Sequence, residues 1–192
     1  MARAEQVIDL QRQRTQQRLR MSRMVLSGLR VAIFCDLPHT LGMLHVLSDL
    51  GCTPVLIGIR GHSLGGESEL REAATRTQAP LRDDLPIIDN PSIHRVRTEM
   101  ERLIKDQEVD VLIGSSTEIN TVATLDPEIA LYIDHGATWA GSGPKIVEFG
   151  FPCRNYHVVR SSPTMGFTGV LGWADRLINA PRLWDTWRTQ LT

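Results

Sequence analysis

The side chains best suited to contact a ligand gather in three short stretches, and each stretch directly follows an apolar run. They are Asp36, His39, Ser115, Ser116, Thr117, Glu118, His157, Arg160 and Ser161. A structural role competes for two of the stretches, because Asp36 or a hydroxyl at 115–117 would also cap a following helix. Both roles can hold at once, since a capped helix still presents N–H groups to an anion. No residue stands out as catalytic, and no set of residues has the spacing of a metal site.

Apolar runs that alternate with helical patterns place these stretches in a fold. Buried strands are expected at 29–35, 54–59, 85–89, 109–113 and 148–153, and helices at 4–26, 40–50, 67–77, 92–106 and 166–178. Continuous apolar strands that alternate with helices predict a parallel sheet covered on both faces. We therefore expect a three-layer, Rossmann-like α/β domain with a mostly parallel sheet of about five strands, plus an N-terminal helix. Ligands bind such sheets beyond the carboxyl ends of the strands, where the three stretches lie.

Composition excludes several classes of protein. Lys and Arg number 21 against 22 Asp and Glu, so the net charge of −1 offers no basic field for nucleic acid or an anionic membrane. No apolar run approaches the roughly 20 residues of a membrane span, and the charged N-terminus does not resemble a signal peptide. Cys35, Cys52 and Cys153 are far apart and form neither a disulfide framework nor a zinc pattern. We expect a cytoplasmic, reduced, globular protein.

The charge is divided unevenly along the chain. Residues 1–30 hold seven arginines against Glu5 and Asp9, a net charge of +5, which leaves −6 on residues 31–192. We expect a basic helix at 1–28, a Rossmann-like domain at 29–180 and an apolar turn or helix at 181–192. The basic helix is expected to dock at its two ends on the acidic remainder, with a contact to a partner subunit as the alternative. No aromatic residues interleave with the arginines, which argues against nucleic acid.

Two nucleotide-binding signatures are missing. No Gly-x-Gly-x-x-Gly follows the first strand, and no Walker A pattern occurs in a chain with only two lysines, Lys105 and Lys145. ATP hydrolysis is therefore not expected of this chain.

Two blocks of sequence resemble one known family. The first runs Gly28-Leu-Arg-Val-Ala-Ile-Phe-Cys-Asp36, then His39-Thr-Leu-Gly42 and Leu50-Gly-Cys-Thr-Pro-Val55. The second is Glu148-Phe-Gly-Phe-Pro152, then His157, then Ser162-Pro-Thr-Met-Gly-Phe167-Thr-Gly169. Over residues 25–180 the chain resembles the last Rossmann domain of the nitrogenase component 1 family. That family includes the dinitrogenase subunits, their cofactor-assembly homologues and the dark-operative protochlorophyllide reductases.

The resemblance implies a component of a two-part, ATP-driven reductase. An iron protein with its own P-loop would hydrolyse ATP and pass electrons to a component-1 assembly that includes a longer subunit. His157 would lie near the metal-binding histidine of true nitrogenases or face a substrate, with an ordinary loop histidine as the alternative. The planar fork of Arg160 would suit a carboxylate of a tetrapyrrole or of an organic-acid cofactor arm, or would form a surface ion pair.

The chain departs from the family in length. Family members carry three such domains, and their cluster-ligating cysteines lie mainly in the preceding two. Iron–sulfur clusters typically need four cysteines, so we expect no cofactor bound by this chain alone, although an iron–sulfur, tetrapyrrole or metal cofactor is possible in the assembly. Two function classes stay open: a subunit, or C-terminal portion, of a nitrogenase-like reductase that is inert in isolation, and a stand-alone, non-catalytic Rossmann module that binds a tetrapyrrole, cluster or protein partner. A homo-oligomer is possible in either class.

Overall fold

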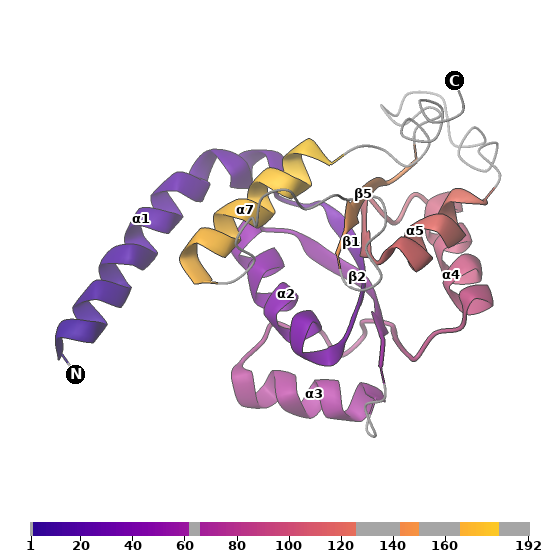
Figure 1. Cartoon of the computed structure of the whole chain (residues 1–192), viewed down its shortest axis with the longest axis horizontal. Coiled ribbons are helices and arrows are strands. Elements are labelled where there is room, and N and C mark those ends of the chain that lie inside the picture. Colours follow the sequence, from indigo (N-terminus) through magenta and orange to yellow (C-terminus); the bar gives the residue numbers. More distant parts are fainter. Residues whose placement is uncertain (1, 62–65, 126–142, 150–165, 181–192) are drawn as a thin grey trace.

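A computed structural model of the chain describes residues 2–61, 66–125, 143–149 and 166–180, and shows an α/β fold around one parallel sheet (Figure 1). The described strands are β1 (Arg30–Cys35), β2 (Thr53–Ile59), β3 (Ile87–Asp89), β4 (Val111–Gly114) and β5 (Lys145–Glu148). The described helices are α1 (Ala2–Leu26), α2 (Leu37–Leu50), α3 (Gly66–Thr77), α4 (Ile93–Lys105), α5 (Ser116–Ala123) and α7 (Gly166–Asn179). The strand order is β3-β2-β1-β4-β5, and every pairing is parallel.

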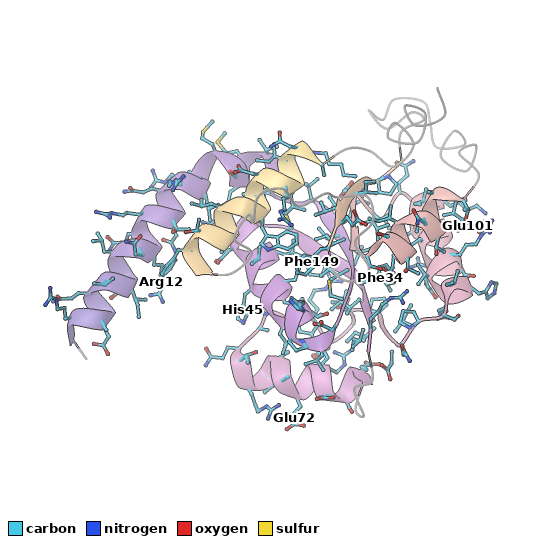
Figure 2. The ribbon with its side chains drawn as sticks, in the orientation of Figure 1. Arg12, Phe34, His45, Glu72, Glu101 and Phe149 are labelled. Atoms are coloured by element: carbon cyan, nitrogen blue, oxygen red, sulfur yellow. The ribbon has the colours of Figure 1, made fainter. Side chains whose placement is uncertain are left out.

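Helices cover both faces of this sheet, as the apolar strands predicted. Side chains of a strand alternate between faces, so Val31 and Ile33 of β1 pack with α1, α2 and α7 in one buried cluster. Phe34 points to the opposite face, where it packs with α4 and α5, as Figure 2 also shows. The helix α3 adds Leu70 to the α2 side, beside β2. The predicted three-layer, Rossmann-like fold is confirmed.

An ion pair joins the amino ends of the two central strands. The Arg30 guanidinium lies 2.9 Å from the Asp110 carboxylate, which also accepts a hydrogen bond from the Arg30 backbone N–H at 2.7 Å. Hydrogen bonding to Asp110 raises the pKa of Arg30 above its ordinary value. This contact holds the start of β4 beside the start of β1.

The largest differences from the expected element boundaries are at the second helix and the fifth strand. The second helix begins at Leu37 rather than residue 40, because Asp36 caps it and Pro38 fits the first turn, where no N–H partner is needed. The fifth strand occupies Lys145–Glu148, so its prediction at 148–153 is wrong at the start, and residues 150–153 lie outside the described part of the chain. The strand β5 pairs with β4 residue by residue, so it ends at Glu148, opposite Gly114, the last residue of β4.

The helix α1 packs against the rest of the molecule through its second half. Thr15, Leu19 and Leu26 are buried, and they face α7 and α2. The first half extends past the other elements into open space (Figure 1). Among the described helices, none combines the length and the apolar character needed to cross a membrane.

Candidate functional site

The carboxyl edge of the sheet brings together the ends of β1 and β4. These strands are neighbours, yet the chain leaves β1 into α2 on one face and leaves β4 into α5 on the other. The strand order reverses at such a point, and ligands of open α/β sheets bind in the crevice it creates. The first two predicted stretches, Asp36 with His39 and residues 115–118, therefore lie at this switch point.

Asp36 and His39 form a local pair at the start of α2. The Asp36 carboxylate accepts a hydrogen bond from the His39 backbone N–H at 3.0 Å, which caps the helix. The same Oδ1 lies 2.6 Å from Nδ1 of the His39 ring. Both side chains are about half exposed, at 50% and 56%. With Nδ1 held by the carboxylate, the Nε2 atom has no hydrogen-bond partner within the described residues, an arrangement that fixes the tautomer and leaves Nε2 to a ligand or partner.

Aromatic side chains support the back of the imidazole ring. Phe149, which directly follows β5, contacts the His39 ring edge-on with 5.2 Å between centroids. It contacts Trp173 of α7 in the same way at 4.9 Å. Phe149 lies between α7 and the sheet in Figure 2, and Trp173 is buried. This support depends on three separate elements, and the sequence analysis did not find it.

Ser115 and Glu118 form a capping box at the start of α5. Glu118 Oε2 accepts hydrogen bonds from the backbone N–H of Ser115 at 2.8 Å and from its hydroxyl. The Ser115 hydroxyl oxygen accepts from the Thr117 N–H at 3.2 Å. The box is compact because Gly114 precedes it: a Cβ at Gly114 would lie 3.1 Å from Cβ of Glu118. Ser115 therefore caps α5, as predicted, and the fully buried Glu118 completes a capping box.

Arg60 completes this buried cluster from a third strand. It directly follows β2, its N–H donates to the Cys35 carbonyl at 2.8 Å, and its guanidinium pairs with Oε1 of Glu118. The Arg60 side chain is about one-third exposed, but the guanidinium atoms Nε and Nη2 are buried. Arg60 is not among the residues predicted from the sequence, where it precedes a glycine-rich stretch. The available signal was its position after an apolar strand, the same signal that identified Asp36.

Ser116 links α5 to the next strand. Its hydroxyl donates a hydrogen bond to the carboxylate of Glu148, the last residue of β5. Glu148 pairs with Gly114 in the sheet ladder, which brings its side chain to the start of α5. The sequence analysis placed Glu148 at the start of a strand rather than at the end of one, and so did not include it among the candidate residues.

Carboxylates of the chain already occupy both helix N-termini. Asp36 accepts from α2, and Glu118 accepts from the first residue before α5, while Glu148 lies beside them. A helix N-terminus attracts an anion through its free N–H groups and its dipole. Here the edge has three carboxylates, with Arg60 and His39 as the facing basic groups, so it favours a hydrogen-bond donor or a cation over an anion.

The two described thiols lie at opposite ends of the sheet: Cys35 ends β1, and Cys52 precedes the start of β2. Burial, followed by the charges of Asp36 and Glu118, raises the pKa of Cys35 to about 12. Burial and the Asp110 charge raise the pKa of Cys52 to about 11. In the metal-free chain both thiols are therefore protonated near neutral pH. Within the described ranges, no three His, Cys, Asp or Glu residues are placed to share a metal ion.

The third predicted stretch cannot be placed beside the other two. His157, Arg160 and Ser161 lie outside the described residues, as does Cys153. The structure brings the two described stretches to one sheet edge. The carboxylates of both Asp36 and Glu118 lie close enough to Cys35 to raise the pKa of its thiol.

Comparison with known proteins gives a family and a fold. The family model for "Nitrogenase component 1 type Oxidoreductase" matches residues 1–181. No curated protein matches the chain at a significant level. Among solved structures, a chain from "Nitrogenase Cp1 at pH 6.5" superposes on 94% of this chain with a TM-score of 0.58 and 17% sequence identity. The superposition covers 34% of that chain, so this chain spans about a third of its length.

Proposed function

Because the chain belongs to the nitrogenase component 1 type oxidoreductase family, we propose that it serves as a subunit, or as the C-terminal portion of one, in a nitrogenase-like two-component reductase. An ATP-hydrolysing iron protein supplies electrons to the assembly, and a longer component-1 subunit completes it. The acceptor is a metal cofactor or a tetrapyrrole-type substrate. The isolated chain is inert.

The observation that supports this role best is the half-exposed Asp36–His39 pair at the switch point. Asp36 holds the ring through Nδ1, and the aromatic contact with Phe149 restricts its rotation. The chain therefore presents an oriented Nε2 atom at an edge that belongs to no other described contact. Such an atom can accept a hydrogen bond from a substrate or from a partner subunit. Residues 115–118 and Arg60 form the rigid wall beside it.

The described residues do not fit an iron–sulfur cluster held by this chain alone. A cluster needs thiolate ligands, usually four, and the two described cysteines are buried at opposite ends of the sheet. Any cluster of the assembly would then be ligated chiefly by other parts of it, and this chain would contribute a wall of the site.

The buried thiols also support a second candidate function. A stand-alone Rossmann module that binds a tetrapyrrole, a cluster or a protein partner without turnover needs no thiolate ligands of its own. It would use the same edge, with His39 as the contacting residue. The two candidates differ in whether a longer component-1 subunit is required.

Anaerobic purification separates them. The tagged chain is expressed together with a longer component-1 subunit and an iron protein, and each fraction is assayed for iron and for its visible spectrum. We expect the isolated chain to lack stoichiometric iron and the longer subunit to co-purify. Replacing His39 with Ala weakens co-purification, whereas His45→Ala does not, because His45 is exposed on the outer side of α2 (Figure 2). Stoichiometric iron with charge-transfer absorption in the isolated chain contradicts the inert role, and absence of any co-purifying subunit favours the stand-alone module.

A further inference from the structure

The helix α1 has a second apolar face that is open to solvent. Val7, Leu10, Met21 and Met24 are 54%, 46%, 72% and 78% exposed. Among the described residues outside α1, the large hydrophobic side chain with comparable exposure is Ile93. An exposed apolar face of this extent on one element indicates an interaction surface.

This face is distinct from the one that packs on the molecule. Residues of an α-helix advance by about 100° each, which places Leu10 and Met21 within roughly 20° of one another around the axis. Thr15, Leu19 and Leu26, which are buried against α7 and α2, lie roughly 120–180° away from them around the axis. The face therefore points away from the body along the whole helix.

The spacing along the face is that of a two-helix contact. Positions 7, 10, 14, 17, 21 and 24 follow one another in alternating steps of three and four residues, which is the seam of a coiled coil. The outer positions are apolar. The two central positions of the seam are the polar residues Arg14 and Gln17.

The charge along α1 shows which orientation a second copy would take. The first half has Arg3 and Arg12 against Glu5 and Asp9, so it is neutral. The second half has four arginines (Arg14, Arg18, Arg20 and Arg23) and no acidic residue, so its charge is +4. A parallel pair would place +4 against +4, whereas an antiparallel pair places each basic half beside a neutral half that contains two carboxylates. Antiparallel helix dipoles also attract.

We propose that two copies of this chain dimerise through an antiparallel pairing of their α1 helices. Leu10 of one copy packs on Met21 of the other, Val7 packs on Met24, and Arg14 lies beside Gln17 at the centre. Each contact occurs twice, as twofold symmetry requires. The charge pattern and the matched apolar extents select a second copy as the occupant, independently of the reductase role.

Sedimentation velocity on the full chain tests the dimer. The wild-type chain is expected to sediment as a dimer, and Leu10→Glu shifts it to a monomer at the same concentration. The matched control is Gln16→Glu, which adds the same charge at an exposed position roughly 130° from the face. Leu10 is half exposed, so circular dichroism should show both variants folded. A monomeric wild type, or a dimer that survives Leu10→Glu, overturns the proposal; binding of a longer subunit to this face instead would appear as the former.

Cross-linking tests the orientation. A chain with both Leu10→Cys and Met21→Cys should form a covalent dimer on mild oxidation, whereas neither single variant should. In the antiparallel pair the two position-10 side chains are about 16 Å apart along the axis, beyond the reach of a disulfide. The wild-type chain, oxidised in parallel, gives the background from its own cysteines, of which Cys35 and Cys52 are buried. Efficient cross-linking of either single variant indicates a parallel pair and overturns the proposed orientation.

Discussion

The turns after β1 and after β4 use the same capping chemistry in two different environments. In each, a carboxylate accepts a backbone N–H at the start of a helix: Asp36 for α2 and Glu118 for α5. Asp36 is half exposed, and both the backbone N–H and the ring that it contacts belong to His39, three residues away. Glu118 is fully buried, and its other partner, Arg60, comes from a different strand. The first turn can give up its contacts to a ligand at little cost in stability, whereas the second cannot.

The largest expected effect comes from breaking the buried pair. Glu118→Ala leaves the Arg60 guanidinium without its carboxylate in a largely buried position and removes the α5 cap. Loss of one partner of a buried ion pair typically costs about 3–5 kcal/mol, so urea unfolding should show a decrease in this range. A decrease below about 1 kcal/mol, as for an exposed pair, would mean that the two turns are equivalent.

A double replacement separates the charge from the packing. In Arg60→Met/Glu118→Leu neither buried charge remains, and replacing a buried pair by apolar groups is often neutral. We expect this variant to recover most of the stability that Glu118→Ala loses, measured in the same urea titration. If the double variant is as unstable as the single one, the cap or the local packing, and not the unpaired guanidinium, accounts for the loss.

The thiol between the two turns gives the next effect. Cys35 has a pKa of about 12 in the folded chain, raised from 9.0 chiefly by burial. Below pH 9 the thiol is protonated in both states and stability does not depend on it. Between about pH 9 and 12 the unfolded chain loses this proton and the folded chain keeps it, so the free energy of unfolding falls by up to about 1.4 kcal/mol per pH unit. The difference in slope between wild type and Cys35→Ala measures this contribution and removes that of other groups; equal slopes would contradict a buried thiol.

A smaller effect is expected at the exposed turn. Asp36→Ala removes the α2 cap and should lower the free energy of unfolding by about 1 kcal/mol. Asp36→Asn is the control, because Asn caps a helix as well as Asp does, and it should leave stability nearly unchanged. An equal loss in both variants would show that the charge on the carboxylate, through His39, matters more than the cap.

The two turns also show what could be predicted from the sequence. The strand β1, the Asp36 cap and the Ser115 cap depend on residues at most a few positions apart, and local patterns predicted them; the contribution of Glu118 to the second cap was not predicted. The Arg60–Glu118 pair depends on two strands meeting in the right order, which no local pattern specifies. The sheet order and the aromatic support of His39 are hidden for the same reason.

The fifth strand shows a second limit. The strand β5 begins at Lys145, a charged residue, whereas it was predicted to start at Glu148. The Lys145 ammonium group donates to the carbonyl oxygens of Leu177 at 3.3 Å and Ile178 at 2.9 Å, at the end of α7. A cation at a helix C-terminus is satisfied there. A charged residue in a strand can thus be compatible with the fold when a distant element supplies its partner.

The smallest effect on stability, and the most direct test of the exposed turn, belongs to His39. Its side chain is 56% exposed, so His39→Ala should change the free energy of unfolding by no more than about 0.5 kcal/mol, close to the value for His45→Ala on the same helix. If the turn contributes to a shared site, the two variants must differ in retention of the longer component-1 subunit even though they are equally stable. If the variant lost stability together with subunit retention, the ring would act through its packing on Phe149. Equal retention would remove His39 from the site and leave the wall formed by Arg60 and Glu118 as a structural feature. Equal stability with unequal retention is the one combination that a purely structural turn does not produce.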